Sequence, residues 1–245
     1  MRLCVLGSGS AGNALLVEGP EGPVLVDCGL LWSELVARAK RAGLSLTGLR
    51  YVLLTHEHAD HARGLASLRR RGVKVVASAG TLRALGVRGL VAEPGLEVAG
   101  IRLFPIPLPH DAREPLGFRL ECAGLRIGVV TDLGRVTPPV LESLKGCALL
   151  VFESNHDLAM LLTGPYPWPL KMRILGPLGH LANDEAAQAL RALRDWAQTV
   201  FLAHLSQENN RPELALETVA QALNGWKGHL LLTYPDRPSA VFASG

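Results

Sequence analysis

The chain has 245 residues, of which 48% are hydrophobic and 19% are charged, and its formal net charge is +3 at pH 7. This composition excludes an intrinsically disordered chain and provides for a sizeable hydrophobic core. The weakly basic balance permits an anionic substrate without requiring one, and we expect a single domain over residues 1–245.

No apolar stretch approaches the roughly 20 residues that a membrane-spanning helix needs. The opening sequence, MRLCVLGSGSAGN, reaches glycine and serine after a few residues, so it reads as a first strand rather than a signal peptide. The four cysteines form no CxxC pair, and we expect buried free thiols in a reducing compartment. These features predict a cytoplasmic protein without a membrane partner.

The elements alternate along the chain. Residues 2–30 read as successive short strands joined by glycine turns. Apolar residues at helical spacing then predict helices over 31–43, 60–72, 183–198 and 211–225. The apolar run at 101–109 contains three prolines, which indicates an irregular or edge strand. This order predicts a layered α/β protein in which two sheets are sandwiched between helices.

Five of the expected strands run directly into a side chain that can bind a metal or move a proton. These side chains are His56, His110, Asp132, Glu153 and His204. In sheets packed against helices, binding groups gather where strands end and loops begin. We therefore expect the five strand ends to converge on one place.

The segment HEHADH, residues 56–61, carries three of the histidines and one aspartate directly after an apolar run. His56 and His58 are two residues apart, so their side chains point the same way in an extended segment. Asp60 stands where a helical His-Glu-x-x-His zinc motif would need its second histidine, so that motif fails. Imidazoles with one carboxylate suit zinc, manganese or iron, and the segment predicts a loop wrapped around metal.

HEHADH matches the HxHxDH signature of the metallo-β-lactamase superfamily, and the rest of the chain resembles that family from end to end. The resemblance implies an αββα sandwich, with two mixed β-sheets flanked by helices, and two divalent metal ions (Zn²⁺ or Mn²⁺) at the strand ends. It implies that one metal takes His56, His58 and His110, that the other takes Asp60, His61 and His204, and that Asp132 bridges the pair. Asp27, after an earlier strand, would support the ligand loop by hydrogen bonding.

The same resemblance indicates the chemistry. His58 occupies a position where oxygen- and NO-reducing diiron relatives carry glutamate, which favours hydrolysis, with a hydroxide between the metals as nucleophile. Asp60 is expected to be essential for catalysis as well as a ligand. The GHLAND segment resembles the GH(S/T) motif of superfamily phosphodiesterases such as tRNase Z, in which a histidine protonates the leaving oxygen. His180 would supply that proton, or it would cap the helix that follows.

Several blocks, among them HDAREPLGF, GPYPWPLKMRILG and HLSQENN, resemble the YycJ/WalJ group of the superfamily. That group is associated with 5′→3′ exonuclease activity on double-stranded DNA and with mismatch repair. The leading hypothesis is therefore a dinuclear-metal phosphodiesterase with DNA as substrate. Candidate substrate contacts are Asn155, His156, Lys171 and Arg173. Alternatively, Asn155 or His156 fixes its loop, and the aromatic residues around Lys171 belong to the core.

Two other functions are compatible with the same residues. A small-molecule hydrolase of esters, thioesters or cyclic phosphodiesters would need only the metal core. A metal-occupied regulatory protein without activity would keep the same ligands. The ligand set accommodates Zn²⁺ and Mn²⁺ equally, and the sequence leaves the oligomeric state open.

Overall fold

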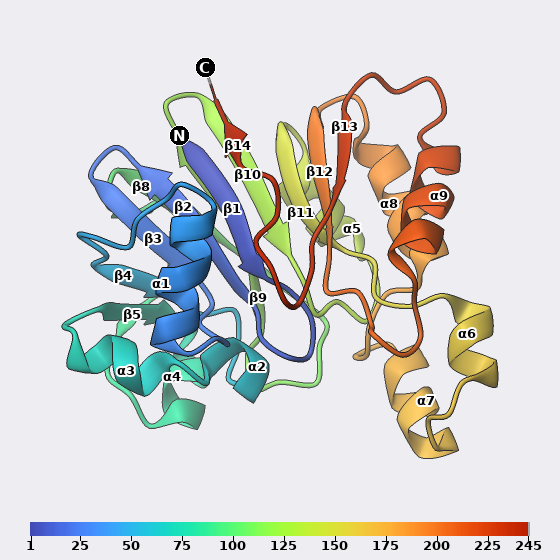
Figure 1. Ribbon diagram of the computed structural model, residues 1–245, viewed down its shortest axis with the longest axis horizontal. Helices are drawn as coiled ribbons and strands as arrows, with labels where there is room; N and C mark the ends of the chain where they lie inside the picture. Colours follow the sequence, from blue (N-terminus) through green and yellow to red (C-terminus); the bar gives the residue numbers. More distant parts are fainter. Residues whose placement is uncertain (245) are drawn as a thin grey trace.

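Two seven-stranded β-sheets form the centre of the computed structural model, which describes residues 1–244 (Figure 1). The first sheet has the order β14-β1-β2-β3-β4-β5-β6, with bounds Phe242–Ala243, Arg2–Gly7, Ala14–Gly19, Gly22–Val26, Tyr51–Leu53, Lys74–Ala77 and Leu90–Val91. The second has the order β13-β12-β11-β10-β9-β8-β7, with bounds His229–Leu232, Thr199–Ala203, Leu149–Glu153, Leu125–Val130, Leu116–Cys122, Ile101–Pro107 and Leu96–Val98. Both sheets mix parallel and antiparallel pairs.

Helices cover the outer face of each sheet. The first sheet is covered by α1 (Trp32–Arg41), α3 (Leu65–Arg70) and α4 (Ala79–Leu85). The second is covered by α5 (Pro138–Leu144), α8 (Asn183–Leu193) and α9 (Pro212–Ala222). The predicted αββα sandwich is confirmed. Within residues 1–244, no helix combines the length and the apolar character that crossing a membrane requires.

The strands β11 and β12 of the second sheet are buried on both faces. Along β12, Phe201 packs into the core between the two sheets, whereas Leu202 packs against the helices outside. The same alternation places Val151 of β11 in the inner core and Phe152 in the outer one. Strands buried on both faces read as continuous apolar runs, which explains why the sequence revealed them. This packing gives the residues at the strand ends a rigid support.

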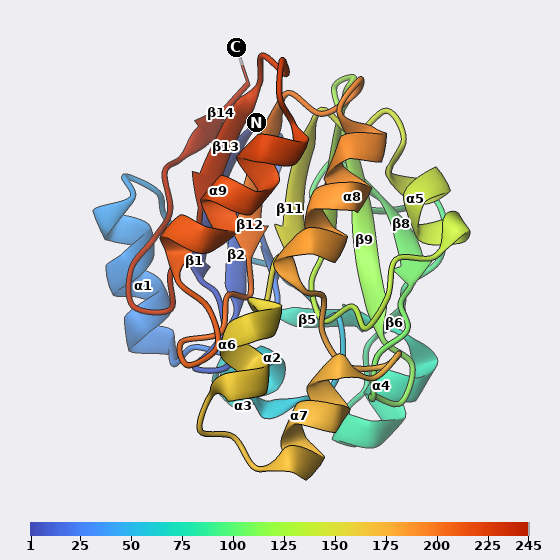
Figure 2. The same cartoon turned by 90° about the vertical axis from the view of Figure 1, so that its right-hand side faces the viewer.

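The parallel strands end at the same edge of the sandwich. β3 and β4 are parallel neighbours in one sheet, and β10, β11 and β12 are parallel neighbours in the other. Three further helices lie at this edge: α2 (Ala59–Ala62), α6 (Leu158–Thr163) and α7 (Trp168–Leu175). Figures 1 and 2 show them at the lower end of the molecule, away from both chain termini. The histidine and carboxylate side chains that follow these strands are therefore brought together.

The structure corrects one predicted helix. Residues 60–72 do not form one continuous helix, because α2 and α3 are separated at Gly64. The Gly64 backbone lies against the segment after β3, where its N–H donates to the carbonyl of Cys28. A Cβ atom at this position would come within 2.3 Å of the carbonyl oxygen of Leu30. The break is thus set by a contact with a segment more than thirty residues away in the sequence.

Within the proline-rich block GPYPWPLKMRILG, residues 168–175 form the helix α7. Pro169 lies in the first turn of the helix, where its missing N–H costs no hydrogen bond. The prolines of the 101–109 run behave as expected. β8 pairs with the short β7 only through residue 103, so Pro105 and Pro107 lie where β9 is the only neighbouring strand among the described residues.

Candidate metal centre

Three residues at the shared edge have left-handed backbone conformations. Asp27, Asp132 and His204 have φ values of 60°, 59° and 56°. Non-glycine residues rarely adopt this region, and each instance costs on the order of 1–3 kcal/mol. They follow β3, β10 and β12, respectively, so each strand turns sharply as it ends. Strain of this kind gathers at functional sites, where the surrounding structure holds it in place.

The first cluster consists of His56, His58 and His110, whose ligand atoms lie within 4.8 Å of one another. His56 Nε2 is 3.0 Å from His58 Nδ1. His110 directs Nδ1 toward the carbonyl oxygen of Gly179 at 3.2 Å, which leaves its buried Nε2 without a hydrogen bond. Burial lowers the pKa of His56 to about 2 and also lowers the pKa of His110. Both imidazoles are therefore neutral, which is the form that binds cations.

The second cluster consists of Asp60, His61 and His204. Asp60 Oδ2 lies 3.5 Å from His61 Nε2 and 3.6 Å from His204 Nε2. Burial works against ionisation of Asp60, but the neighbouring imidazoles of His204 and His61 hold its pKa below the usual range. His61 is fully buried, and its Nδ1 is 2.8 Å from Asp27 Oδ2. That contact leaves the other ring nitrogen of His61 facing the cluster.

Asp132 lies between the two clusters. Its Oδ1 is 3.7 Å from His110 Nε2 and 3.5 Å from His204 Nε2, and its Oδ2 is 3.0 Å from His61 Nε2. Burial works against protonation of His61 and His204, yet the charge of Asp132 raises the pKa of both, that of His204 to about 10. Protons or cations are therefore needed between these atoms to balance the carboxylates.

The geometry fits divalent cations. Two ligand atoms that each bind one ion at about 2.1 Å lie roughly 3.4 Å apart in a tetrahedral site. The separations between Asp132 and the three histidines around it, 3.0 to 3.7 Å, bracket that value. His110 Nε2, His204 Nε2 and Asp132 Oδ2 are buried and make no hydrogen bond among the described residues. Buried groups of this kind are expected to coordinate metals. All seven predicted ligands are thus brought together.

Residues near the N-terminus hold the clusters in place. Asn13 Nδ2 lies 3.0 Å from His61 Nε2 and 3.3 Å from Asp60 Oδ2. Ser8 Oγ accepts a hydrogen bond from the backbone N–H of His204 at 2.7 Å. The glycine-rich turn after β1 therefore contacts residues of the second cluster, and its position directly after a strand was the signal available in the sequence.

Asp27 lies beneath the ligand loop, as expected of a supporting residue. Its carboxylate accepts hydrogen bonds from the backbone N–H and the hydroxyl of Thr55, at 2.9 and 3.0 Å. Together with the contact to His61, these bonds fix the start of the HEHADH segment. Carboxylates that orient a histidine ligand in this way determine which of its nitrogens faces the metal.

His180 and Glu153 form a pair beside the second cluster. His180 Nδ1 lies 2.7 Å from Glu153 Oε1, and the backbone N–H of Leu133 donates to Glu153 Oε2. Burial works against both charges, but each partner stabilises the other: the pKa of His180 is raised and that of Glu153 is lowered to about 2. The alternative that His180 caps the following helix is wrong, because α8 has Ala182 as its N-cap. Sequence reasoning noticed Glu153 at a strand end but gave it no role.

Two of the four candidate substrate contacts lie inside the protein. Asn155 donates from Nδ2 to the carbonyl oxygen of His204 at 2.8 Å, so it fixes the loop that carries this ligand. His156 is 1% exposed, and neither of its ring nitrogens has a hydrogen-bond partner within residues 1–244. Burial lowers the pKa of His156 to about 4, so the ring is neutral. The interpretation that these residues fix their loop agrees with this arrangement.

The other two candidates belong to α7 and differ from each other. Lys171 is buried, and its Nζ donates to the carbonyls of Leu162 and Gly164 at 2.7 and 2.8 Å. These bonds join α7 to α6, and they leave the ammonium group of Lys171 inaccessible to a substrate. Arg173 is exposed and lines a pocket beside His180. Trp168 at the start of the same helix is 59% exposed, so it does not belong to the core.

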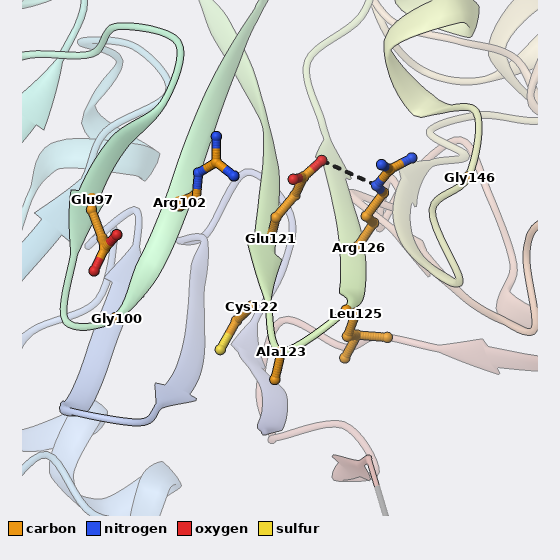
Figure 3. Close-up of a pocket in the computed structure, with 10 residues that line it drawn as sticks. Glu97, Gly100, Arg102, Glu121, Cys122, Ala123, Leu125, Arg126 and Gly146 are labelled. Atoms are coloured by element: carbon orange, nitrogen blue, oxygen red, sulfur yellow. Dashed lines mark ion pairs between the residues drawn. The ribbon is translucent and has the colours of Figure 1, made fainter.

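A larger hollow of about 480 Å³ lies elsewhere, around the β9–β10 hairpin (Figure 3). Two of its charged side chains, Arg126 and Glu121, pair with each other at 3.1 Å. β10 begins at this hairpin and ends near Asp132, so roughly 20 Å of strand separates the hollow from the clusters. No histidine is among the residues that line this hollow. The candidate metal-binding residues lie at the opposite end of β10.

Residues 23–205 match the family model for the β-lactamase superfamily domain. The chain belongs to this superfamily. Together with the clustered histidines and aspartates, membership identifies a metallo-β-lactamase-fold hydrolase with candidate sites for divalent metal. The predicted family and the prediction of a hydrolytic enzyme are both confirmed.

Two curated relatives extend over most of the chain. The exodeoxyribonuclease YycJ of Bacillus anthracis is 36% identical over 235 residues, which cover 91% of this chain and 89% of that protein. The exodeoxyribonuclease WalJ of Streptococcus pneumoniae is 32% identical and covers 91% and 88%, respectively. Both of these relatives are named as exodeoxyribonucleases.

Solved structures agree on the fold. The metallo-β-lactamase fold protein YhfI from Bacillus subtilis superposes with a TM-score of 0.76 at 15% identity, covering 99% of both chains. The short form of human tRNase Z superposes with a TM-score of 0.67 at 16% identity, also covering 99% of both. At these identities the similarity concerns the arrangement of sheets and helices alone.

Proposed function

We propose that the chain is a metal-dependent phosphodiesterase that cleaves DNA, acting as an exonuclease on double-stranded DNA in the 5′→3′ direction. The observation that carries the proposal is the His180–Glu153 pair beside two clusters of metal-binding side chains. Hydrolysis of a phosphodiester expels an alkoxide, which is a poor leaving group unless it receives a proton. The two exodeoxyribonuclease relatives support DNA as the substrate.

The clusters would hold two divalent cations, Zn²⁺ or Mn²⁺. His56, His58 and His110 would hold one, Asp60, His61 and His204 would hold the other, and Asp132, which lies between the two clusters, would serve as a ligand for both. When bound, such cations make water nucleophilic near neutral pH and neutralise charge on the attacked phosphate. The ligand set of imidazole and carboxylate is suited to either metal.

Side chains of this protein would supply the proton for the leaving oxygen. Glu153 holds the Nδ1 proton of His180, so the other ring nitrogen is the one that can face a substrate. Burial works against the imidazolium form of His180, but Glu153 raises its pKa above the ordinary value, which favours a proton on the ring that can pass to the leaving oxygen. The side chain of His180 is 20% exposed, which gives a substrate access to it.

Cleavage of end-labelled duplex DNA tests the proposal. We expect the metal-loaded protein to degrade 5′-phosphorylated duplex DNA, and we expect Asp60→Ala to abolish cleavage while circular dichroism shows an intact fold. Asp195→Ala is the matched control, because Asp195 is an exposed aspartate whose ion pair is with its neighbour Arg194, away from the clusters. Undiminished nuclease activity in Asp60→Ala would contradict the proposal. Turnover of thioesters or cyclic phosphodiesters without DNA cleavage would replace it with a small-molecule hydrolase.

A further inference from the structure

A small pocket adjoins the proposed proton donor. Its volume is about 160 Å³, and His180 forms part of its wall. The glycine-rich turn after β1 contributes Ser10, and the loop after β12 contributes Ser206. Further lining residues, Arg173 among them, come from α7 and the residues before it, the helix that projects at the lower end of Figure 2. The pocket therefore lies beside the proposed proton donor and includes none of the seven predicted metal ligands in its lining.

Some of the residues that line the pocket present hydrogen-bond donors. Arg173 Nε donates to Asp111 Oδ2 at 2.6 Å, which holds the guanidinium in place. Its terminal nitrogens have no hydrogen-bond partner among the described residues, so they are free to bind an anion. Ser206 Oγ accepts from the backbone N–H of Asn209 at 3.0 Å, which leaves its own proton available. Ser10 adds a second, exposed hydroxyl. A guanidinium with hydroxyls is a typical phosphate-binding set.

The rest of the lining includes apolar and aromatic side chains. Tyr166, Leu170 and Ile174 contribute them, and Lys171 fastens this part of the chain to α6. A pocket that combines a guanidinium and hydroxyls with apolar side chains suits a nucleotide, which has a charged phosphate and a flat base. The attachment of α7 to α6 means that this part of the lining is formed before any substrate binds.

The size of the pocket excludes a duplex. Pockets for drug-sized ligands are typically about 300–1,000 Å³, so about 160 Å³ accommodates no more than one nucleotide. The major groove of B-DNA alone is about 12 Å wide, so a base-paired segment does not enter. A strand can therefore reach the pocket only by its end, after the last base pair has opened.

The chemistry of the step fixes which end enters. Cleavage breaks the bond between phosphorus and O3′ of the nucleotide in the pocket, and a bond forms from the water oxygen to phosphorus. His180 gives its proton to O3′ and regains one from solvent, while the attacking water loses a proton to solvent. The released nucleotide keeps its 5′-phosphate and gains a 3′-hydroxyl. The shortened strand is left with a new 5′-phosphate.

We propose that this pocket binds the unpaired 5′-terminal nucleotide of a DNA strand and recognises its 5′-phosphate through Arg173, Ser10 and Ser206. The inference rests on the proposed function and specifies how it selects a strand end. Each cut creates the group that the pocket recognises in the next cycle. A 5′-hydroxyl end lacks the anion and leaves the guanidinium without its partner.

Two measurements test the pocket with duplexes that differ only in a 5′-phosphate or a 5′-hydroxyl. The first is kcat/KM for the metal-loaded protein. The second is binding of labelled duplex by fluorescence anisotropy in EDTA, where no cleavage takes place. We expect wild-type protein to prefer the phosphate by roughly tenfold to a hundredfold in both measurements. In Arg173→Gln the preference should fall to roughly threefold or less, with the 5′-hydroxyl duplex little affected, and Ser206→Ala should reduce it partly.

Arg102→Gln is the matched control, because Arg102 is an exposed arginine that lines the remote hollow of Figure 3. It should keep the full preference. The pocket assignment would be overturned if wild-type protein had equal kcat/KM and equal affinity for the two duplexes. It would also be overturned if Arg173→Gln lowered both quantities equally on both duplexes. Either result would leave the nuclease proposal in place. A protein that cleaves no DNA but still binds the phosphorylated end more tightly would overturn the nuclease activity and keep the pocket.

Discussion

His180 Nδ1 and Glu153 Oε1 are 2.7 Å apart, and Glu153 is fully buried where β11 ends. The two residues lie 27 positions apart in the chain and come from different elements. A carboxylate on one ring nitrogen fixes the tautomer and the orientation of a histidine, as in other proton-transfer sites. The pair therefore gives His180 both its direction and its charge.

The role of His180 as proton donor predicts a dependence on the leaving group. His180→Ala should lower kcat on duplex DNA by about 10²- to 10⁴-fold, because an alkoxide then leaves without a proton. The same variant should lose much less activity on bis(p-nitrophenyl) phosphate, whose phenolate leaves without assistance. Steady-state kinetics on both substrates makes the comparison. His229→Ala, at an exposed position in β13, is the control. Equal losses on both substrates would assign His180 a structural role.

The role of Glu153 predicts a shift in the pH profile. Burial works against the charged form of His180, and the Glu153 carboxylate raises its pKa. The acid form, and with it kcat, is present below that pKa and is lost as pH rises through it. In Glu153→Gln the charge is removed and the pKa of His180 falls, so the decline of kcat should move to lower pH. A profile of kcat between pH 6 and 10 that is unchanged in the variant would be incompatible with this pairing.

The contact between Asp27 and His61 predicts an effect on metal affinity. Asp27 Oδ2 lies 2.8 Å from His61 Nδ1, and Asp27→Asn removes the charge that orients the ring. Losses of such supporting groups typically weaken metal binding about 10- to 100-fold. Competition with a chromogenic chelator measures the dissociation constant. Asp236→Asn serves as control, because Asp236 is exposed at the surface. An unaltered dissociation constant would show that the orientation of His61 does not need this carboxylate.

Burial of the cysteines predicts low reactivity. All four are free and buried, as expected from the sequence, and burial raises the pKa of Cys147 to about 11. A thiol becomes a nucleophile only as thiolate, so Ellman's reagent should label almost none of them in the native protein at pH 8. In guanidinium chloride it should label all four. Rapid labelling of the native protein would mean that the sandwich opens easily at these positions.

The parts of the site that could be predicted are those encoded locally. HEHADH places four ligands within six residues after an apolar strand, and the run into Asp132 and the run into His204 have the same form. Parallel strands buried on both faces are long apolar runs, so their ends were visible in the sequence. The convergence of those ends follows from sheet topology, and this explains why distant ligands could be assigned together.

The remaining features depend on contacts between distant segments. Gly64 interrupts a helical pattern because a backbone segment around residue 29 passes beside it, which no local pattern reveals. Lys171 resembled a substrate contact because cations and aromatic residues alternate around it, but helix formation turned it toward two carbonyl groups. Glu153 looked like any strand-end carboxylate until the chain brought His180 to it.

The central claim is that remote side chains share bound cations and that these cations are required for cleavage. Metal content measured by mass spectrometry on the same preparation that is assayed on end-labelled 5′-phosphorylated duplex DNA tests it most directly. We expect about two divalent ions per chain, loss of cleavage on exhaustive chelation, recovery with Mn²⁺ or Zn²⁺, and neither tight binding nor cleavage in Asp132→Ala. Full cleavage by protein free of metal, or full metal content in Asp132→Ala, would contradict the account.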